Sequence, residues 1–497
     1  MAGSLHLPKL PPLAAVLAVL IAAAWPLAAR GQSPLTTLYS FSQTDTNGYN
    51  DDGVGPRFAG LVRDSEGNLY GTASAGGPNG NGTVFELGTN GSFSVLHAFS
   101  PLDNLGANGD GATPFGGLVM DHLSNLYGTT FSGGTVPGGV SGGTVFEMAG
   151  DGSFATLHSF NGSVVGSDGA QPEAGLVQGN DSFLYGTTAS GGANEWGALY
   201  DLTTNGDSFS LLYSFSAPYN FDEANTDGLY PHAGLMQGQD GSFYGTTWWG
   251  GSNGNGTIFR FDTDQNLVTL IHSFNATDSF GSNADGQFPE AGLVQDSAGF
   301  LYGTATSGGT NGAGTVFEIS TNGGTFATLH SFSDTGNDGA QPEAGLLMDT
   351  KGNLYGTTFY GGLYGDGTIF EISPNGSNCT TLYSFDSANG TDGANSWGPL
   401  TMDQNGNLYG TTYNGGANGN GTLFSLATIP SLQFSGSRNN LVLSWPSWAT
   451  NFSLVGATSL GVAGEWAAIT NQVSVSGQSF FLSNLVNSQN HFFKLKN

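Results

Sequence analysis

The tetrapeptide L-Y-G-T recurs seven times along the 497-residue chain, and this repetition constrains the fold more than any other feature. Successive copies begin 53 to 59 residues apart, at Leu69, Leu126, Leu184, Phe243 (as F-Y-G-T), Leu301, Leu354 and Leu408. A nearly constant period of this size is typical of the blades of a β-propeller and not of a helical solenoid. We therefore expect one structural unit per repeat.

Each repeat contains four short apolar runs that are separated by turn residues. In the copy from Pro342 to Phe385 the runs are A-G-L-L-M, N-L-Y-G-T-T, G-T-I-F-E-I and T-T-L-Y-S-F. The segments between them are rich in Gly, Asn, Asp and Pro, so the pattern predicts an antiparallel four-stranded sheet per repeat. We expect the small residues of A-G-L and Y-G-T at the crowded centre of a ring of sheets, with the bulky Phe and Tyr towards its rim.

The fourth run indicates how such a ring closes. The other runs occur seven times, whereas the fourth run ends only at Phe99, Phe160, Phe215, Phe274, Phe332 and Phe385. The missing copy, T-T-L-Y-S-F, stands at Thr36–Phe41, ahead of the first repeat. Pairing of this segment with the last repeat would close the ring and remove an exposed sheet edge. The sequence thus predicts an all-β fold, a seven-bladed β-propeller closed by an N-terminal strand.

Composition divides the chain into further segments. Residues 1–31 resemble a secretory signal peptide, because Lys9 precedes an apolar stretch and A-R-G at 29–31 provides a small-x-small cleavage motif. We assign residues 32–427 to the propeller, 428–431 to a linker and 432–497 to a small β domain, of sandwich type and similar to fibronectin-like domains. This organisation predicts a secreted or cell-surface protein with no transmembrane segment after signal cleavage, and we expect a monomer.

Charge and motif content exclude several classes of function. The chain has 38 acidic and 9 basic residues, a balance that disfavours nucleic-acid binding because phosphate contacts need Lys and Arg. Its one cysteine, Cys379, precludes an intramolecular disulfide and is interpreted as a packing residue. The sequence has no nucleophile–base motif, zinc signature or phosphate-binding loop. We therefore predict no catalytic residues and no metal ligands, and expect a protein that is not an enzyme.

Two sets of repeated aspartates are interpreted as structural. A D-x-x-G-N turn precedes L-Y-G-T at Asp64, Asp121, Asp296, Asp349 and Asp403, with Gly179 and Gly238 in the other copies. A D-G dipeptide precedes every A-G-L run, at Asp52, Asp110, Asp168, Asp227, Asp285, Asp338 and Asp392. For the D-G set we predict a turn or an inter-blade hydrogen bond, with a ring of calcium sites as the alternative. Histidine and tyrosine exchange at one position of the fourth run, which indicates packing and not metal binding.

Candidate ligand-binding residues are those that differ from blade to blade. The loops before the first strand and between the second and third strands share one face of a propeller. Just before the Gly or Pro of the A-G-L runs, at the expected channel mouth, stand Arg57, Phe115, Glu173, His232, Glu290, Glu343 and Trp397. Such residues would suit a polar ligand such as a sugar or peptide, and paired carboxylates also serve glycosidases. The alternative, which the sequence favours somewhat, is that these glutamates are simply solvated.

Aromatic residues in the loops between the second and third strands form a second candidate set. They are Phe131, Trp248, Trp249, Phe359, Tyr360 and Tyr413. Aromatic rings beside Gly-Gly could stack on sugar rings, or they could pack against the next blade. The sequence does not favour either alternative.

The repeat G-L-x-x-D-x-x-G-N-L-Y-G-T-T-x-x-G-G-x-x-x-x-G-T-V-F-E resembles the GloVer tandem repeat of bacterial choice-of-anchor proteins, over residues 36–426. More distantly it is similar to two-component-regulator and NHL-type propeller repeats. The resemblance implies export and a surface role, and it implies no catalytic residues.

Three hypotheses of function follow. The first is a secreted, non-enzymatic propeller that binds a glycan or an extracellular protein at its channel mouth. The second is a carbohydrate-active hydrolase or lyase that uses Glu173, Glu290 or Glu343 with His232. The third is a structural protein of the cell envelope.

Overall fold

A computed structural model describes residues 35–58, 60–136, 141–162, 167–219 and 224–428, together with the strands of the C-terminal segment. The chain divides into two compact units, one of residues 34–429 and one that includes residues 430–497. The predicted signal peptide, residues 1–31, and most of the predicted linker lie outside the described residues. Within the described part, no helix is long and apolar enough to cross a membrane.

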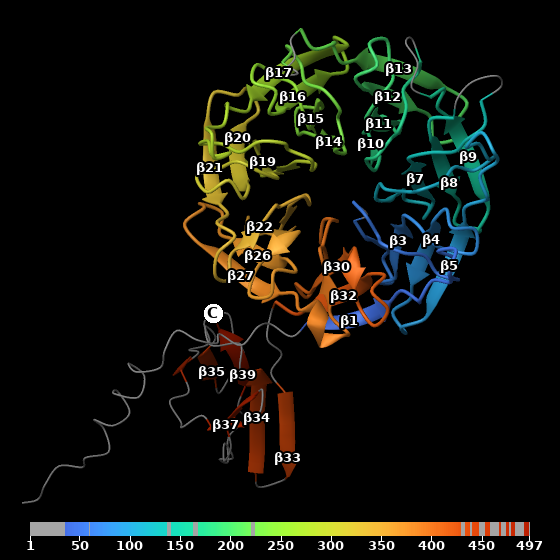
Figure 1. Cartoon of the computed structure of the whole chain (residues 1–497). Coiled ribbons are helices and arrows are strands. Elements are labelled where there is room, and N and C mark those ends of the chain that lie inside the picture. The colour runs from blue at the N-terminus through green and yellow to red at the C-terminus, as the bar shows by residue number, and fades with distance from the viewer. Residues whose placement is uncertain are drawn as a thin grey trace, which may run out of the picture. The chain divides into compact units, whose positions relative to one another are not determined.

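Residues 34–429 form a ring of seven four-stranded antiparallel sheets (Figure 1). Blades 1 to 3 consist of β2 (Val62–Arg63), β3 (Leu69–Ala73), β4 (Thr83–Leu87) and β5 (Phe93–Ala98); β6 (Val119–Met120), β7 (Leu126–Thr130), β8 (Thr144–Met148) and β9 (Phe154–Ser159); and β10 (Val177–Gln178), β11 (Leu184–Thr188), β12 (Ala198–Leu202) and β13 (Phe209–Ser214).

The remaining blades follow the same order from the channel to the rim. Blades 4 to 6 consist of β14 (Met236–Gln237), β15 (Phe243–Thr247), β16 (Thr257–Asp262) and β17 (Leu267–Ser273); β18 (Val294–Gln295), β19 (Phe300–Ala305), β20 (Thr315–Ser320) and β21 (Phe326–Ser331); and β23 (Leu347–Met348), β24 (Leu354–Thr358), β26 (Thr368–Ile372) and β27 (Cys379–Ser384). A 3-10 turn, η1 (Ser387–Asn389), follows β27.

Blade 7 closes the ring as predicted. Its strands β29 (Thr401–Met402), β30 (Leu408–Thr412) and β32 (Thr422–Leu426) are completed by β1 (Leu35–Ser40) from the beginning of the described chain. The pairing of β1 with β32 is antiparallel and places Leu35 opposite Leu426 and Ser40 opposite Thr422. In Figure 1 the blue β1 lies beside the orange β32. The fold-class prediction, a seven-bladed propeller with an N-terminal closing strand, is confirmed.

The innermost strands are shorter than the A-G-L runs suggest, because neighbouring blades meet there. Each comprises two residues and begins after the leucine. The residues before it bond to the adjacent blade instead, as when the Thr129 hydroxyl donates to the Ala174 carbonyl at 2.8 Å. Backbones also approach closely, since a Cβ on Gly175 would lie 2.6 Å from the Gly117 carbonyl oxygen. This contact explains the glycine of A-G-L in blade 3, and Gly234 and Gly292 have a looser version of it at 3.2 Å.

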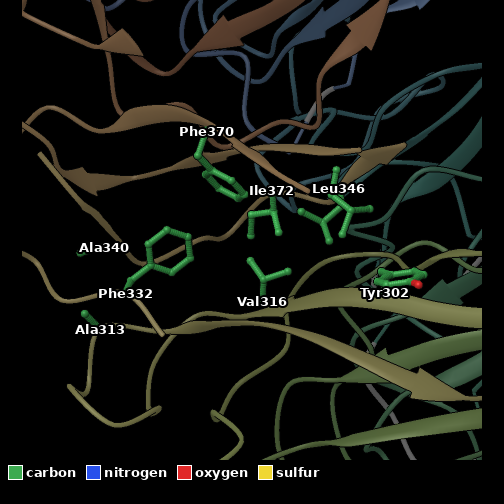
Figure 2. Close-up of a cluster of buried hydrophobic side chains, with 9 residues drawn as sticks. Tyr302, Ala313, Val316, Phe332, Ala340, Leu346, Phe370 and Ile372 are labelled. Atoms are coloured by element: carbon green, nitrogen blue, oxygen red, sulfur yellow. The ribbon is translucent and has the colours of Figure 1, made fainter. Parts of the chain in front are cut away.

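The hydrophobic core lies between blades. Each of the seven buried clusters among the described residues combines side chains from two adjacent blades. Figure 2 shows one of them, in which Val316 and Phe332 of blade 5 pack with Leu346, Phe370 and Ile372 of blade 6. Full burial of such side chains contributes roughly 1.5–3 kcal/mol each. The ring is therefore held by every blade contacting its neighbours.

The Y-G-T glycine has a different role from the one that the sequence suggested. A Cβ on Gly71 would lie 2.7 Å from the Phe85 ring, and the same relation recurs between Gly356 and Phe370 at 2.5 Å. The glycine thus makes room for the aromatic side chain of the next strand in its own blade. These phenylalanines are fully buried within the blades, whereas the prediction placed them towards the rim.

The D-G aspartates tie each outer strand to the start of the following blade. The Asp110 carboxylate accepts hydrogen bonds from His97 Nε2 at 3.0 Å and from the Ser100 N–H at 3.0 Å. Asp227 accepts from the Tyr213 hydroxyl in the same way, at 2.6 Å. This is the inter-blade hydrogen bond that we predicted, and it explains why His and Tyr exchange on the outer strand. Within the described residues, no three His, Cys, Asp or Glu side chains gather as a metal site would require.

The aspartates of the D-x-x-G-N turns also act as predicted. Asp349 Oδ1 accepts the N–H groups of Lys351 and Asn353, and Oδ2 accepts the Asn353 amide. Where the repeat has glycine instead, an aspartate two residues later compensates, since Asp181 accepts the Tyr185 hydroxyl at 2.7 Å. Cys379 lies partly buried in β27, and burial raises the pKa of its thiol to about 12.

The C-terminal unit consists of two antiparallel sheets. A four-stranded sheet has the order β33 (Gln433–Ser437), β34 (Asn440–Pro446), β38 (Ser479–Leu482) and β37 (Ser474–Ser476), and a three-stranded sheet has the order β36 (Ala467–Ala468), β35 (Ser453–Ala457) and β39 (Phe492–Lys496). Leu443 and Leu454, one from each sheet, are buried. Two such sheets are the elements of the predicted sandwich-like domain.

Candidate functional site

A backbone hook positions one loop residue of each blade at the channel mouth. At the start of every repeat one residue adopts a left-handed conformation, with φ between 53° and 59°, at Gly55, Thr113, Gln171, Tyr230, Phe288, Gln341 and Asn395. Its N–H donates to the preceding blade, as from Thr113 to the Asn81 carbonyl at 2.9 Å. Six of the seven residues are not glycine, so the strain of this conformation is maintained by its surroundings.

The carbonyl of the hook residue holds the loop between the second and third strands. The Trp248 N–H donates to the Tyr230 carbonyl at 3.0 Å, and Phe359 and Gln341 form the same bond at 2.9 Å. The residues in this position are Ser74, Phe131, Ala189, Trp248, Thr306, Phe359 and Tyr413. Four of the six predicted aromatic loop residues therefore occupy one structural position, next to the mouth.

The two loops also pair directly, and this pairing confirms that they share a face. In blade 6, β22 (Gly339–Ala340) pairs with β25 (Tyr360–Gly361), and in blade 7, β28 (Gly393–Ala394) pairs with β31 (Asn414–Gly415). The first five blades have a single bridge at the same place, such as Ala112 with Ser132.

A cavity of about 350 Å³ lies within the ring, at its axis. Its walls are the A-G-L backbones of the blades, and four of the predicted mouth residues line it, namely His232, Glu290, Glu343 and Trp397. Arg57, Phe115 and Glu173 do not line the cavity, but each contacts a neighbouring mouth residue. Thus Glu173 Oε2 lies 3.5 Å from His232 Nδ1.

Phe58 is a mouth residue that the sequence reasoning missed. Blade 1 has three residues between Pro56 and Gly60, whereas blade 2 has two between Pro114 and Gly117. Counted from the glycine, Phe58 and not Arg57 is the equivalent of Phe115, and it is Phe58 that lines the cavity. The signal was present as a one-residue insertion in the first repeat. The chain accommodates the extra residue because Phe58 adopts a left-handed backbone conformation, with a φ of 47°.

The inserted position places the Arg57 guanidinium among aromatic rings. Its central carbon lies 4.2 Å from the centre of the Trp397 ring, 4.5 Å from that of Phe115 and 5.1 Å from that of Phe58. Such contacts stabilise a cation by about 0.5–2 kcal/mol each. Arg57 Nε is buried without a hydrogen-bond partner, and no ion pair joins Arg57 to any residue that the structure describes.

The carboxyl groups at the mouth hold their protons up to unusually high pH. Burial raises the pKa of Glu173 and of Glu290 to about 7, and the Glu173 charge adds to the effect on Glu290. Burial and the Glu290 charge raise the pKa of Glu343 to about 8. The positive charge of Arg57 opposes all three shifts without reversing them. At mildly acidic pH these groups are therefore hydrogen-bond donors.

His232 is neutral over the same range. Burial, with a smaller effect of Arg57, lowers the pKa of His232 to about 4. Its contact with Glu173 is therefore one between neutral groups at pH 5–6 and not a salt bridge.

The aromatic loop residues pack on the mouth residues themselves. The Trp248 ring centre lies 4.9 Å from that of His232 and 4.5 Å from that of Trp249, on which it stacks. Phe359 and Tyr413 lie 5.1 and 5.5 Å from Trp397, and Phe131 lies 5.0 Å from Phe115. The Tyr360 ring centre lies 4.7 Å from that of Phe359, and Tyr360 is 47% exposed. Packing and ligand stacking are thus compatible here, since a ring can use one face for each.

The ring of seven blades around an axial cavity defines a β-propeller repeat protein. The chain belongs to the Gloeobacter/Verrucomicrobia repeat family, whose model matches residues 29–225, 179–390 and 277–463. The resemblance to the GloVer repeat is thereby confirmed.

Among solved structures, the chain is similar to a putative 6-phosphogluconolactonase from Bacteroides uniformis, with 15% identity and a TM-score of 0.42 over 86% of this chain and 98% of the other. It is also similar to a chain of a nidogen/laminin complex, with 14% identity and a TM-score of 0.37 over 61% and 91%. TolB from Acinetobacter baumannii matches with 14% identity and a TM-score of 0.34 over 61% and 60%. No curated protein matches the sequence.

Proposed function

We propose that this chain is an exported, non-enzymatic propeller that binds a glycan at the channel mouth. One observation carries the proposal: the cavity combines hydrogen-bonding groups with aromatic faces at its opening. Glu290, Glu343 and His232 supply the polar groups, and Phe58 and Trp397 supply the rings. Sugars present hydroxyl groups at their edges and C–H groups on their faces, so they match both kinds of surface. The cavity volume is at the lower end of the range for small-ligand sites.

A glycan array followed by calorimetry of the best ligand tests the proposal. We expect binding to be weakened about 5- to 30-fold by Trp397→Ala, which removes a ring face worth roughly 1–2 kcal/mol. Phe280→Ala is the matched control, because Phe280 is an aromatic residue that is 87% exposed and does not line the cavity. Both variants need a wild-type melting temperature to be informative about binding. Absence of any glycan ligand, or equal loss in both variants, would contradict the proposal.

A hydrolase or lyase is the second candidate, and one observation favours it. Burial raises the pKa of both Glu290 and Glu343, and the charge of Glu290 raises that of Glu343 further. An acid beside an ionised carboxylate is the arrangement of glycosidases. This candidate predicts release of reducing ends, or of unsaturated uronates, that Glu343→Gln abolishes. Binding of an intact oligosaccharide without turnover over a day would exclude it.

A further inference from the structure

Arg57 departs from the repeat in a way that points to a specific role. The residues between its hook residue, Gly55, and the A-G-L run include one more position than in the other blades. The extra residue requires a left-handed phenylalanine, Phe58, and bulky residues adopt this conformation only at a cost. Blade 1 thus tolerates local strain, and the result is a cation at the mouth.

The side chains that pack on Arg57 do not neutralise its positive charge. Residues 35–428 contain only four basic side chains, Arg57, Arg63, Arg260 and Lys351. Arg260 is paired with Asp240 at 3.3 Å and with Asp262 at 3.7 Å. Arg57 instead lies against three aromatic rings, which stabilise its positive charge without providing a hydrogen-bond acceptor. A guanidinium held in this way is suited to forked hydrogen bonding of a carboxylate or sulfate.

The other donors at the mouth have the same preference. Three buried indole N–H groups have no hydrogen-bond partner among the described residues, namely those of Trp248, Trp249 and Trp397. Glu343 Oε2 is also buried without such a partner. An indole N–H can only donate, and a protonated carboxyl can also donate. A ligand with acceptor groups would therefore supply partners for these donors.

We propose that the mouth selects acidic sugars, and that Arg57 binds their carboxylate or sulfate group while the aromatic residues hold the ring. This inference rests on the proposed glycan-binding function and names the class of glycan. The titratable groups that act on Arg57 are Glu173, Glu290, Glu343 and His232. The three glutamates compete with an anionic ligand only when they are ionised.

The selectivity and its pH dependence can be measured with matched sugars. The probes are a galacturonic acid tetramer, its methyl ester, which has the same backbone without charge, and a sulfated galactose tetramer. We expect the wild-type protein to bind at least one of the two acidic tetramers at least tenfold more tightly than the methyl ester at pH 6. Affinity for the acidic sugar should fall several-fold between pH 6 and pH 8.5, because the glutamates ionise in this range, while affinity for the ester changes little.

Two variants assign the effect to Arg57. Arg57→Gln should abolish the preference for the acidic sugar and retain binding of the ester. Lys351→Gln is the control, since it removes one positive charge from an exposed turn on the opposite face and should leave both affinities unchanged. Glu343→Gln, which cannot ionise, should reduce the fall in affinity between pH 6 and pH 8.5, and it provides a second test should Arg57→Gln fail to fold.

The outcomes separate the inference from the proposed function. Equal binding of acidic and uncharged sugars, or a preference that survives Arg57→Gln, would overturn the role of Arg57 and leave glycan binding intact. Failure to bind any of the three tetramers, together with an empty glycan array, would overturn both. The sulfated arm shows which of the two anionic groups Arg57 recognises.

Discussion

One residue position on the outer strands accepts either histidine or tyrosine because both side chains can make the same bond. His158 Nε2 lies 2.8 Å from Asp168, and the Tyr213 hydroxyl lies 2.6 Å from Asp227. The histidine ring also stacks on the next blade, with 3.9 Å between the ring centres of His158 and Phe209. A hydrogen bond and a stacked ring therefore link each such position to its neighbour.

We predict that His158→Tyr leaves the free energy of unfolding within about 0.5 kcal/mol of the wild-type value, because the hydroxyl replaces the donor. His158→Phe retains the stacking and loses the donor, so it should destabilise the protein by about 1 kcal/mol. Urea unfolding of the two variants gives both values. Equal stability of the Phe and Tyr variants would show that the hydrogen bond contributes nothing.

A second residue-scale prediction concerns the glycine before the third strand. Gly314 has a φ of 100°, and an added Cβ would lie 2.5 Å from Pro342 Cδ of the next blade and 2.7 Å from the Ala305 carbonyl. Gly299 has a similar φ of 91° with nothing within 4 Å. Gly299→Ala should cost about 1–2 kcal/mol for the backbone conformation alone, whereas Gly314→Ala should cost at least about 2 kcal/mol more because it also overpacks the contact between blades. Thermal unfolding of the pair separates the two effects, and equal losses would contradict the contact.

Among the elements, β1 is the strand that closes the ring. It provides the outer strand of blade 7, and Phe41, directly after it, is fully buried against blade 1. Without β1, the hydrogen-bonding edge of β32 would be exposed, and exposed edges promote association between chains.

We predict that deletion of residues 35–41 destabilises the propeller by at least about 3 kcal/mol, since burial of one Phe alone contributes about 2–3 kcal/mol. The deleted protein should also form oligomers as its concentration rises, which light scattering after size-exclusion chromatography would detect. A synthetic peptide of residues 34–42 should restore the monomer and the melting temperature. A scrambled peptide is the control, and a monomeric deletion variant of wild-type stability would contradict ring closure by β1.

At the scale of the whole molecule, two groups of carboxyls give stability opposite dependences on pH. Burial acts to raise the pKa values of Asp110, Asp168 and Asp338, but hydrogen bonds, above all from histidine, lower them below the usual range. Their contribution is complete above the unfolded-state pKa near 3.9 and is lost as the pH falls. The mouth glutamates have raised pKa values, so the folded state binds more protons than the unfolded state between about pH 4.5 and 8, and stability falls as the pH rises.

We therefore predict a maximum of the melting temperature between about pH 4 and 6, with a decline on both sides. Glu343→Gln should raise the free energy of unfolding on the order of 2 kcal/mol at pH 8.5 and change it little at pH 5, because only the ionised carboxylate is penalised by burial. His158→Phe should affect the acidic side instead. A melting temperature that rises steadily from pH 5 to 8.5 would contradict the raised pKa values of the mouth glutamates.

The sequence alone determined the architecture, through the period of the repeat and the displaced copy of its fourth strand. Seven copies of L-Y-G-T and one displaced copy of T-T-L-Y-S-F specify the number of blades and the segment that closes the ring, because strand and turn signals are local in sequence. The structural roles of the Asp64-type and Asp52-type residues followed for the same reason.

The composition of the candidate site was decided by the tertiary structure. Arg57 meets Phe115 and Trp397 from blades 2 and 7, and the carboxyls that lie near it come from blades 3, 5 and 6. The inserted residue that makes Phe58 the lining residue is visible in the sequence, but its effect on Arg57 is not. Burial, charge coupling and ring contacts arise between segments hundreds of residues apart, and closure of the ring alone brings these segments to one axis.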